Sequence, residues 1–325
     1  MNAAPFVSTG ELPDSSQVIA RVEEAHELFR TNDDGTVSDV YPALARVSPG
    51  LFGICVAAVD GRVHAVGDAG VEFTIMSVAK PFVFALVCEA LGAEEVRAKL
   101  GVNSTGLPFN APEAIERSVD GRTNPMVNPG AIAATSLAPG ATAAEKWRFV
   151  CDGLSRFAGR PLGLDEEVYE SASATNTRNR SLAQLLQHHD RIYSDPAQAV
   201  DLYTRQSCLS VTAQDLAVMG ATLADGGVNP LTGERVVDAS TCRHTLVVMA
   251  TAGLYETSGD WLYDVGLPGK SGIGGGIVTV APGKGGLGTF APLLDRAGNS
   301  VKGQLAARFL SQSLGLDLFV SKPAR

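Results

Sequence analysis

The stretch EFTIMSVAKPFVFALVCEALG, residues 72–92, is the part of the chain on which the interpretation of the rest depends. After Lys80 it is almost entirely apolar, which predicts a buried helix. Ser77 stands three residues before Lys80, at the mouth of this apolar segment. A charged group placed in an apolar core costs free energy unless it has a partner or a task. The sequence therefore indicates that Ser77 and Lys80 have a function in common.

Ser77 and Lys80 have the spacing of neighbours on one helix face. If Ser77 begins the helix, Lys80 follows one turn later on the same side. The helix N-terminus favours a developing alkoxide, and an amine withdrawn from water has a lowered pKa and accepts a proton. We therefore expect Ser77 to be a nucleophile and Lys80 its base. A chance match is the alternative, although no other S-x-x-K occurs in the chain.

A second element of this chemistry lies far downstream, in GLPGKSGIGGGIVTV, residues 266–280. Its Lys270-Ser271-Gly272 is a K-[ST]-G sequence, which serine β-lactamases and penicillin-binding proteins combine with S-x-x-K. The adjacent glycines allow a substrate to lie against the strand backbone. We expect the backbone N–H groups of Ile273 and Ser77 to form an oxyanion hole.

A phosphate-binding loop is the rival interpretation of GKSGIGGG. The Walker pattern needs a glycine five residues before Gly269, and that position is Asp264. A dinucleotide fingerprint needs a strand, a turn and a helix at the start of a βαβ unit, and this setting is missing from the sequence pattern. Nucleotide binding is therefore disfavoured.

Composition restricts the remaining classes. A net charge of −9 on 325 residues opposes binding to nucleic acid or to an anionic membrane, and no run of eighteen apolar residues predicts a membrane span. The first residues do not resemble a signal peptide. Five widely spaced cysteines without CxxC indicate free thiols and a cytoplasmic protein. His188 and His189 are neighbours that point apart, so no metal site is expected.

Periodicity predicts strands near both ends of the chain and helices between them. The expected strands are residues 51–59, 63–68, 264–272, 276–282 and 286–292. The expected helices are residues 17–30, 72–92, 142–159, 181–192, 196–209, 212–227 and 299–315.

This order predicts an α/β (α+β) fold with one central antiparallel sheet built from both chain ends and a helical lobe inserted between them. We expect a flexible tail at residues 1–14 and a single catalytic domain at 15–320. Its sheet subdomain would comprise about 15–75 and 245–320, and its helical subdomain about 76–244.

Further motifs occur in a fixed order together with the S-x-x-K. They are TNPMVNPGAI (123–132), TRN (177–179), VDLYTRQSC (200–208), TLADGGVNPLTGERV (222–236), GLYETSGDWLYDVGLPGKSGIGGGI (253–277) and LDRAGNSVKG (294–303). With these seven elements the chain resembles the serine-dependent glutaminases, a branch of the β-lactamase-like (transpeptidase-like) fold. The resemblance covers roughly residues 15–315.

The resemblance implies hydrolysis of L-glutamine to glutamate and ammonia through an acyl-enzyme, without a metal or organic cofactor, in a homodimer or homotetramer. It implies that Ser77 is the nucleophile, Lys80 the base and Tyr255 a group that passes protons. It also implies substrate contacts from Asn128, Asn179 and Tyr203, and an oxyanion-hole N–H from Ile273. Purely structural roles are the alternatives: Asn128 could cap backbone in an NP turn, and Tyr203 could belong to the core.

Two departures from the family pattern concern substrate recognition. Val40 stands where the family has a tyrosine, with Tyr41 one place later, and Ala172 stands where it has a glutamate, with Glu170 two places earlier. Both missing groups hold the amino-acid end of glutamine. We expect Glu170, or else Tyr41, to compensate. The alternative is the same chemistry on another amide, such as an N-blocked glutamine, a γ-glutamyl amide or a simple carboxamide.

Two other function classes remain open from the sequence. A non-catalytic binding or sensing module on the same fold would function without the Ser77 hydroxyl. A β-lactam-processing enzyme would carry an S/Y-x-N element between S-x-x-K and K-[ST]-G, and the sequence offers no obvious match for it.

Overall fold

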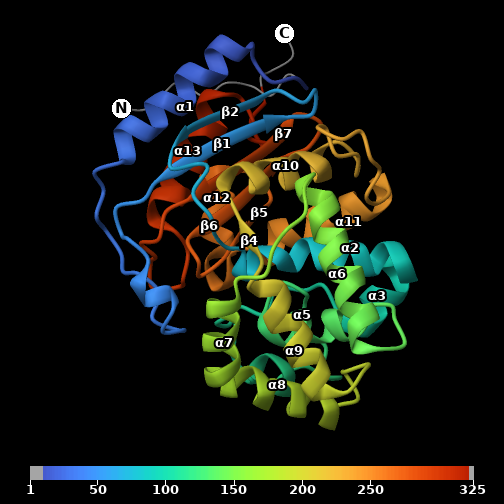
Figure 1. The fold of residues 1–325 in the computed structure, drawn as a ribbon. Coiled ribbons are helices and arrows are strands. Elements are labelled where there is room, and N and C mark those ends of the chain that lie inside the picture. Colours follow the sequence, from blue (N-terminus) through green and yellow to red (C-terminus); the bar gives the residue numbers. More distant parts are fainter. Residues whose placement is uncertain (1–9, 322–325) are drawn as a thin grey trace.

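The computed structural model describes residues 10–321, and its centre is a five-stranded antiparallel sheet. The strand order is β2-β1-β7-β6-β5, and every neighbouring pair is antiparallel. The strands are β1 Gly53–Ala58, β2 Val63–Gly67, β5 Gly269–Ser271, β6 Gly276–Ala281 and β7 Gly285–Phe290. Strands from the two chain ends are thus side by side in one sheet (Figure 1), which confirms the predicted architecture.

Helices cover both faces of the sheet and form the lobe below it in Figure 1. The α-helices before the middle of the chain are α1 Ser15–Phe29, α2 Ala79–Leu91, α3 Ala93–Leu100, α4 Glu113–Glu116, α5 Asn128–Ser136 and α6 Ala143–Ala158. Those that follow are α7 Glu166–Thr175, α8 Thr177–His188, α9 Pro196–Ser207, α10 Ala213–Ala224, α11 Ala239–Ala252, α12 Ser258–Val265 and α13 Val301–Ser313. Short elements complete the chain: η1 Leu44–Arg46, η2 Met76–Val78, η3 Tyr255–Thr257, and the strand pair β3 Phe73–Thr74 and β4 Ser210–Val211.

The alternation of side chains along β1 divides the core into two layers. Ile54 and Val56 belong to a cluster shared with α1 and α13, whereas Cys55 and Ala57 belong to the large cluster on the side of α10. Helix α10 lies directly on β7 because that strand presents glycines. A Cβ at Gly288 would be 2.0 Å from the Ala213 carbonyl oxygen, so only glycine permits this approach.

The sequence pattern located the five strands of the central sheet and seven of the 13 α-helices in the described residues. The expected strand at 264–272 is wrong at its start, because Asp264 and Val265 end α12 and Gly266 turns the chain with φ +69°. Six helices were not recognised individually: α3, α4, α5, α7, α11 and α12. The last two extend helical structure to residue 265.

The subdomain boundaries remain a prediction. The packing shows that one helix contacts the other subdomain more than its own. Helix α10 belongs by sequence to the helical lobe and by contact to the sheet. Residues 1–9 of the expected tail lie outside the described residues. Within 10–14, Leu12 packs against the sheet core and Asp14 caps α1 by accepting a hydrogen bond from the Gln17 N–H at 3.0 Å.

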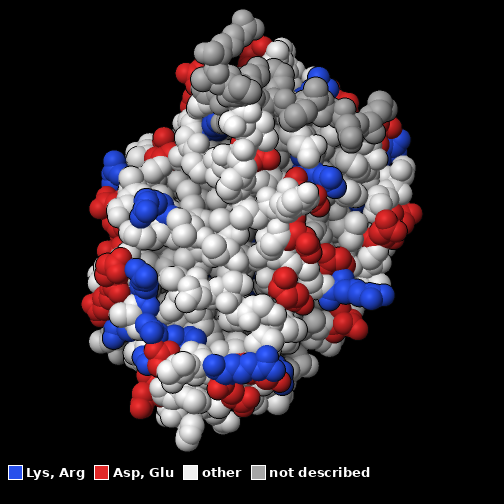
Figure 2. Space-filling model, turned by 180° about the vertical axis from the view of Figure 1, so that it is seen from behind, with Lys and Arg blue, Asp and Glu red and all other residues white. Residues whose placement is uncertain are grey.

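Helix α2 runs between the sheet and the lobe formed by α5, α8 and α9 (Figure 1), so its first turn faces the junction where the lobe meets β5. On the face shown in Figure 2, Lys, Arg, Asp and Glu lie mostly toward the margins around a broad uncharged centre. Over residues 10–321, every helix is too short or too polar to cross a bilayer.

Candidate active site

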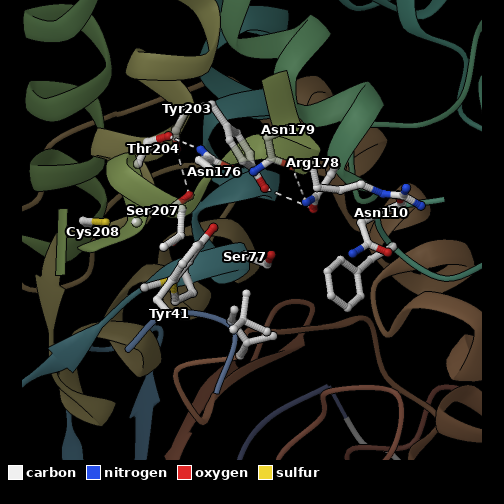
Figure 3. A pocket seen from close by; sticks show the side chains of 17 residues that line it. Tyr41, Ser77, Asn110, Asn176, Arg178, Asn179, Tyr203, Thr204, Ser207 and Cys208 are labelled. Carbon is white, nitrogen blue, oxygen red and sulfur yellow. Dashed lines mark hydrogen bonds between the residues drawn. The ribbon is translucent and has the colours of Figure 1, made fainter. Parts of the chain in front are cut away.

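Ser77 lies in the short turn η2 that joins β3 to α2. The helix expected over residues 72–92 therefore begins later than predicted, at Ala79. The neighbour of Ser77, Met76, is buried and has a positive φ of 47°, an uncommon conformation for a residue with a side chain. Such conformations cost free energy and persist where surrounding structure imposes them, often at functional sites. The turn presents Ser77 at the floor of a pocket, between Tyr41 on one side and Asn110 and Arg178 on the other (Figure 3).

Lys80 follows in the first turn of α2 and is 2% exposed. Its Nζ donates to Asn128 Oδ1 at 2.7 Å and to the Met126 carbonyl oxygen at 3.3 Å. Among the described residues no carboxylate pairs with this amine. Burial lowers the pKa of Lys80 to about 7, so a large fraction of the amine is neutral at physiological pH. A neutral amine beside Ser77 can accept its proton.

Asn128 is held at the start of α5 by the turn that precedes it. Asn124 Oδ1 accepts a hydrogen bond from the Met126 N–H at 2.9 Å, which closes an Asx turn and leaves the Met126 carbonyl directed at Lys80. Asn128 Nδ2 donates to Asn179 Oδ1 at 2.9 Å. Both asparagines are buried and line the pocket, so they are more than backbone caps.

Two tyrosines surround the Ser77 hydroxyl. Tyr203, on α9, donates to Asn128 Oδ1 at 3.1 Å, and Tyr255, in η3, donates to the Ser271 carbonyl at 3.2 Å. Burial raises the pKa of both phenols, and the Ser77 hydroxyl acts on both by lowering it. Lys80 Nζ is 5.9 Å from the centroid of each ring. The Ser77 hydroxyl and the Lys80 amine therefore have these two tyrosines as common neighbours.

Tyr255 is itself held in a strained conformation, with φ +59°. Burial raises the pKa of its phenol to about 12, although hydrogen bonds with Ser77 and Ser271 act in the opposite direction. Burial also raises the pKa of Tyr203 well above its usual value. Both phenols are therefore neutral at pH 7 and can donate or accept hydrogen bonds.

Lys270, on β5, is the second buried amine of the site. Its Nζ donates to the Ser271 carbonyl at 2.6 Å and lies 4.1 Å from the centroid of the Tyr255 ring. Burial and, second to it, the charge of Lys80 lower the pKa of Lys270 well below its usual value. The two lysines are thus close enough for the charge of one to disfavour the charge of the other.

The oxyanion hole expected from the sequence requires two N–H groups that have no partner within the protein. Within residues 10–321, neither the Ser77 N–H nor the Ile273 N–H donates to another protein group. Gly272 brings the end of β5 against η2, because a Cβ there would be only 3.2 Å from the Ser77 nitrogen. Ile273 also lines the pocket.

The pocket above Ser77 has an empty volume of about 670 Å³, open to solvent. Val40, Tyr41 and Ala172 all line it. Glu170 does not line it and is exposed. The reason is helical geometry: residues two apart on α7 point to nearly opposite sides, so Ala172 faces the pocket and Glu170 faces solvent. The structure therefore does not bring Glu170 to the site.

Several pocket residues were not singled out from the sequence. Asn176, buried at the start of α8, donates to Thr204 Oγ1 at 2.7 Å, and Ser207 lies one helical turn after Tyr203 on α9. The i, i+4 spacing of Tyr203 and Ser207 was the available signal. Arg178 and Asn110 had no such signal, because their contact joins segments 68 residues apart: Arg178 Nε donates to the Asn110 carbonyl at 3.0 Å.

Comparison with known proteins agrees with this geometry. The Glutaminase family model matches residues 35–319. Glutaminase 2 of Yersinia pestis is 69% identical over 318 residues, which are 98% of this chain and 94% of that protein. A solved probable glutaminase, ybaS, has a TM-score of 0.93 and 40% identity, covering 95% of this chain and all of that one. Mglu in its glutamate form has a TM-score of 0.87 and 38% identity, covering 95% of this chain and 70% of that one. This chain belongs to the glutaminase family.

Proposed function

We propose that this protein is a hydrolase that converts L-glutamine to L-glutamate and ammonia through an acyl-enzyme on Ser77. The observation that carries the proposal is the burial of Lys80 beside Ser77 with a pKa of about 7 and no carboxylate partner in the described structure. A cation kept dry without a counter-charge is costly as a structural device and useful as a base. Family membership and the glutamate form of Mglu support glutamine as the amide.

In the acylation step, the Lys80 amine takes the Ser77 hydroxyl proton, and Ser77 Oγ attacks the amide carbon of the substrate. The carbonyl oxygen gains the negative charge, which the N–H groups of Ser77 and Ile273 stabilise. Collapse of this intermediate breaks the C–N bond. The nitrogen receives a proton from Lys80, through Tyr255 or directly, and leaves as ammonia.

Deacylation repeats the sequence with water in place of Ser77. Lys80 takes a proton from the water, whose oxygen attacks the ester carbon. The bond to Ser77 Oγ breaks, and the proton returns to Ser77. Asn128, Asn179 and Tyr203 line the route to the reacting carbon and supply amide and phenol groups for the substrate. No step needs a metal or an organic cofactor.

Ser77→Ala tests the proposal. Loss of the nucleophile should lower kcat for ammonia release from L-glutamine by about 10⁴-fold or more. An acylating probe should label wild-type protein on Ser77 and leave the variant unlabelled. Ser104→Ala is the matched control, since Ser104 is exposed and does not line the pocket. Undiminished turnover in Ser77→Ala would contradict the mechanism, and absence of turnover in the wild type would favour a non-catalytic module.

We also infer a cytoplasmic homodimer or homotetramer. The cytoplasmic assignment is supported by the five cysteines, all of which are free in the structure. The oligomeric state rests on the family resemblance alone. Light scattering coupled to size-exclusion chromatography measures the oligomeric state directly, and a monomeric mass would contradict the proposed dimer or tetramer.

A further inference from the structure

The pocket lining contains a positively charged side chain and no negatively charged one, which affects the substrate charge that the pocket favours. Of its 17 lining residues, Arg178 is the only one charged at neutral pH, and none is an aspartate or glutamate. Burial raises the pKa of Tyr41 and of Cys208 to about 12, so neither supplies an anion. Lys80 behind Ser77 adds positive charge whenever it is protonated.

Several carboxylates are near the lining residues in sequence but do not line the pocket themselves. Glu170 is exposed on the outer side of α7. Asp165 caps that helix by accepting a hydrogen bond from a backbone N–H at 2.9 Å. Asp201 accepts hydrogen bonds from Tyr169 at 2.5 Å and from Arg205 at 2.9 Å. None of these groups lines the pocket, and neither does Asp39, which is exposed beside Val40, so a cation among the lining residues has no carboxylate in direct contact.

A carboxylate bound in the pocket has a suitable partner. Arg178 donates its Nε to the Asn110 carbonyl, and within the described residues its Nη groups have no partner. The guanidinium lies at one side of the pocket, beside Asn110 (Figure 3). Charge-assisted hydrogen bonds to a carboxylate are among the stronger ones.

Four other residues of the lining have aliphatic or thioether side chains. Val40, Met76, Ala172 and Ile273 contribute aliphatic surface, and Val40 is 49% exposed, which places it where the pocket meets solvent. An ammonium against such a surface meets only neutral acceptors and loses hydration. An acyl group buries apolar area there instead.

A free amino acid carries a protonated α-amine at neutral pH. We propose that, within the amide hydrolysis proposed above, this pocket favours γ-amides whose α-nitrogen is uncharged, with N-acylglutamine as the simplest member, over free L-glutamine. The α-carboxylate binds Arg178, the acyl group covers the aliphatic wall, and the γ-amide reaches Ser77. Free L-glutamine is cleaved by the same chemistry with lower efficiency.

The test compares kcat/KM for N-acetyl-L-glutamine and L-glutamine at pH 7.5, with ammonia release as the readout. We expect about a tenfold advantage for the acetylated substrate. An equal or lower value for N-acetyl-L-glutamine overturns this inference and leaves the proposed function intact. If neither compound releases ammonia, the proposed function fails as well, so the two failures are distinguishable.

A matched pair of variants at Ala172 tests the cause. Ala172→Glu places a carboxylate in the aliphatic wall of the pocket. It should raise kcat/KM for L-glutamine by about 10–100-fold, which corresponds to one charge-assisted hydrogen bond to the α-ammonium group. It should give no gain for N-acetyl-L-glutamine. Ala172→Gln has nearly the same shape and no charge, and should give no such gain. If both variants change the two substrates alike, the missing carboxylate is not the cause. Should neither variant fold, the wild-type comparison still decides.

Discussion

Lys302 and Lys80 are two buried lysines in different regions of this molecule, and their surroundings differ. Lys302, on α13, is 1% exposed, and its Nζ donates to the Arg30 carbonyl at the C-terminus of α1 at 2.9 Å. The negative end of the helix dipole favours a cation there, and the Phe52 ring lies 5.7 Å from the amine. Lys302 thus joins two helices that cover the same face of the sheet.

Lys80 is equally buried but has no helix C-terminus to favour its charge. Its hydrogen-bond acceptors are a side-chain amide and one carbonyl, and burial lowers its pKa to about 7. The comparison teaches that burial alone does not identify a base. A structural lysine has an acceptor that stabilises its positive charge, whereas a catalytic lysine is placed where that charge is disfavoured.

Replacing Lys80 should have the largest effect and should separate activity from stability. Lys80→Met removes the base and should lower kcat by about 10³-fold, within the usual range for general-base catalysis. It also removes a buried amine whose charge is disfavoured. This gain exceeds the loss of a donor to the Met126 carbonyl, because Asn128 Oδ1 keeps its hydrogen bond from Tyr203, so the free energy of unfolding at pH 7 should rise by about 1–3 kcal/mol. Steady-state kinetics and urea denaturation measure the two quantities. A loss of stability together with activity would make Lys80 a structural lysine like Lys302.

The pH dependence of activity should follow the pKa of Lys80. The base must be neutral, so kcat/KM should fall tenfold per pH unit below about pH 7 and be about 100-fold below its plateau at pH 5. The rates should be measured from pH 5 to 9 with a substrate that has no ionisable amine, so that titration of the substrate does not contribute to the profile. A flat profile across that range would remove the neutral amine from the mechanism.

The free energy of unfolding should also depend on pH through the Lys80 amine, and the lowered pKa fixes the direction of that dependence. Because the pKa of Lys80 drops from 10.5 to about 7 on folding, the unfolded chain binds a proton that the folded chain lacks between those values. Stability therefore rises with pH through this window. The difference in unfolding free energy between the wild type and Lys80→Met should therefore be smaller at pH 9 than at pH 7. A constant difference would place the pKa of Lys80 outside the window.

A smaller effect should come from Asn299, which connects the elements around Tyr255. Its Oδ1 accepts from Ser271 Oγ, and its Nδ2 donates to Thr257 Oγ1 at 3.0 Å. This links β5 to η3 and so positions the carbonyl to which Tyr255 donates. Asn299→Ala should lower kcat about tenfold with little change in KM, because it shifts a proton-transferring group rather than the pocket. Asn299→Asp, which keeps the acceptor, should recover part of the loss, and a change confined to KM would contradict a positioning role.

The parts of the site that were predictable from the sequence are those fixed by local geometry. Ser77 and Lys80 lie within one turn, and K-S-G marked the strand that faces them, so both elements followed from spacing. Contacts such as Lys80 with Asn128 join residues 48 apart, and only the resemblance to a family placed Asn128 near the nucleophile.

Side-chain direction was the weakest part of the sequence interpretation. Glu170 was expected to compensate for Ala172, but a helix turns the two to different sides. Tyr41 would have faced away had its segment been a regular strand, yet the chain around residue 41 is irregular, and both Val40 and Tyr41 reach the pocket. Orientation depends on the type of element, and the sequence did not establish it for these two segments.

The smallest effect on activity should come from Lys302, and it completes the comparison. Lys302→Met removes a hydrogen bond to the end of α1 and leaves the Arg30 carbonyl without its donor, so the free energy of unfolding should fall by about 1–2 kcal/mol. Because α1 and α13 cover the face of the sheet away from the large core cluster that contains α2, kcat should change less than twofold. Measured beside Lys80→Met, this variant should move stability in the opposite direction and leave activity in place. If both variants destabilised the protein equally, the two burial sites would be energetically alike, and the low pKa of Lys80 would lose its physical cause.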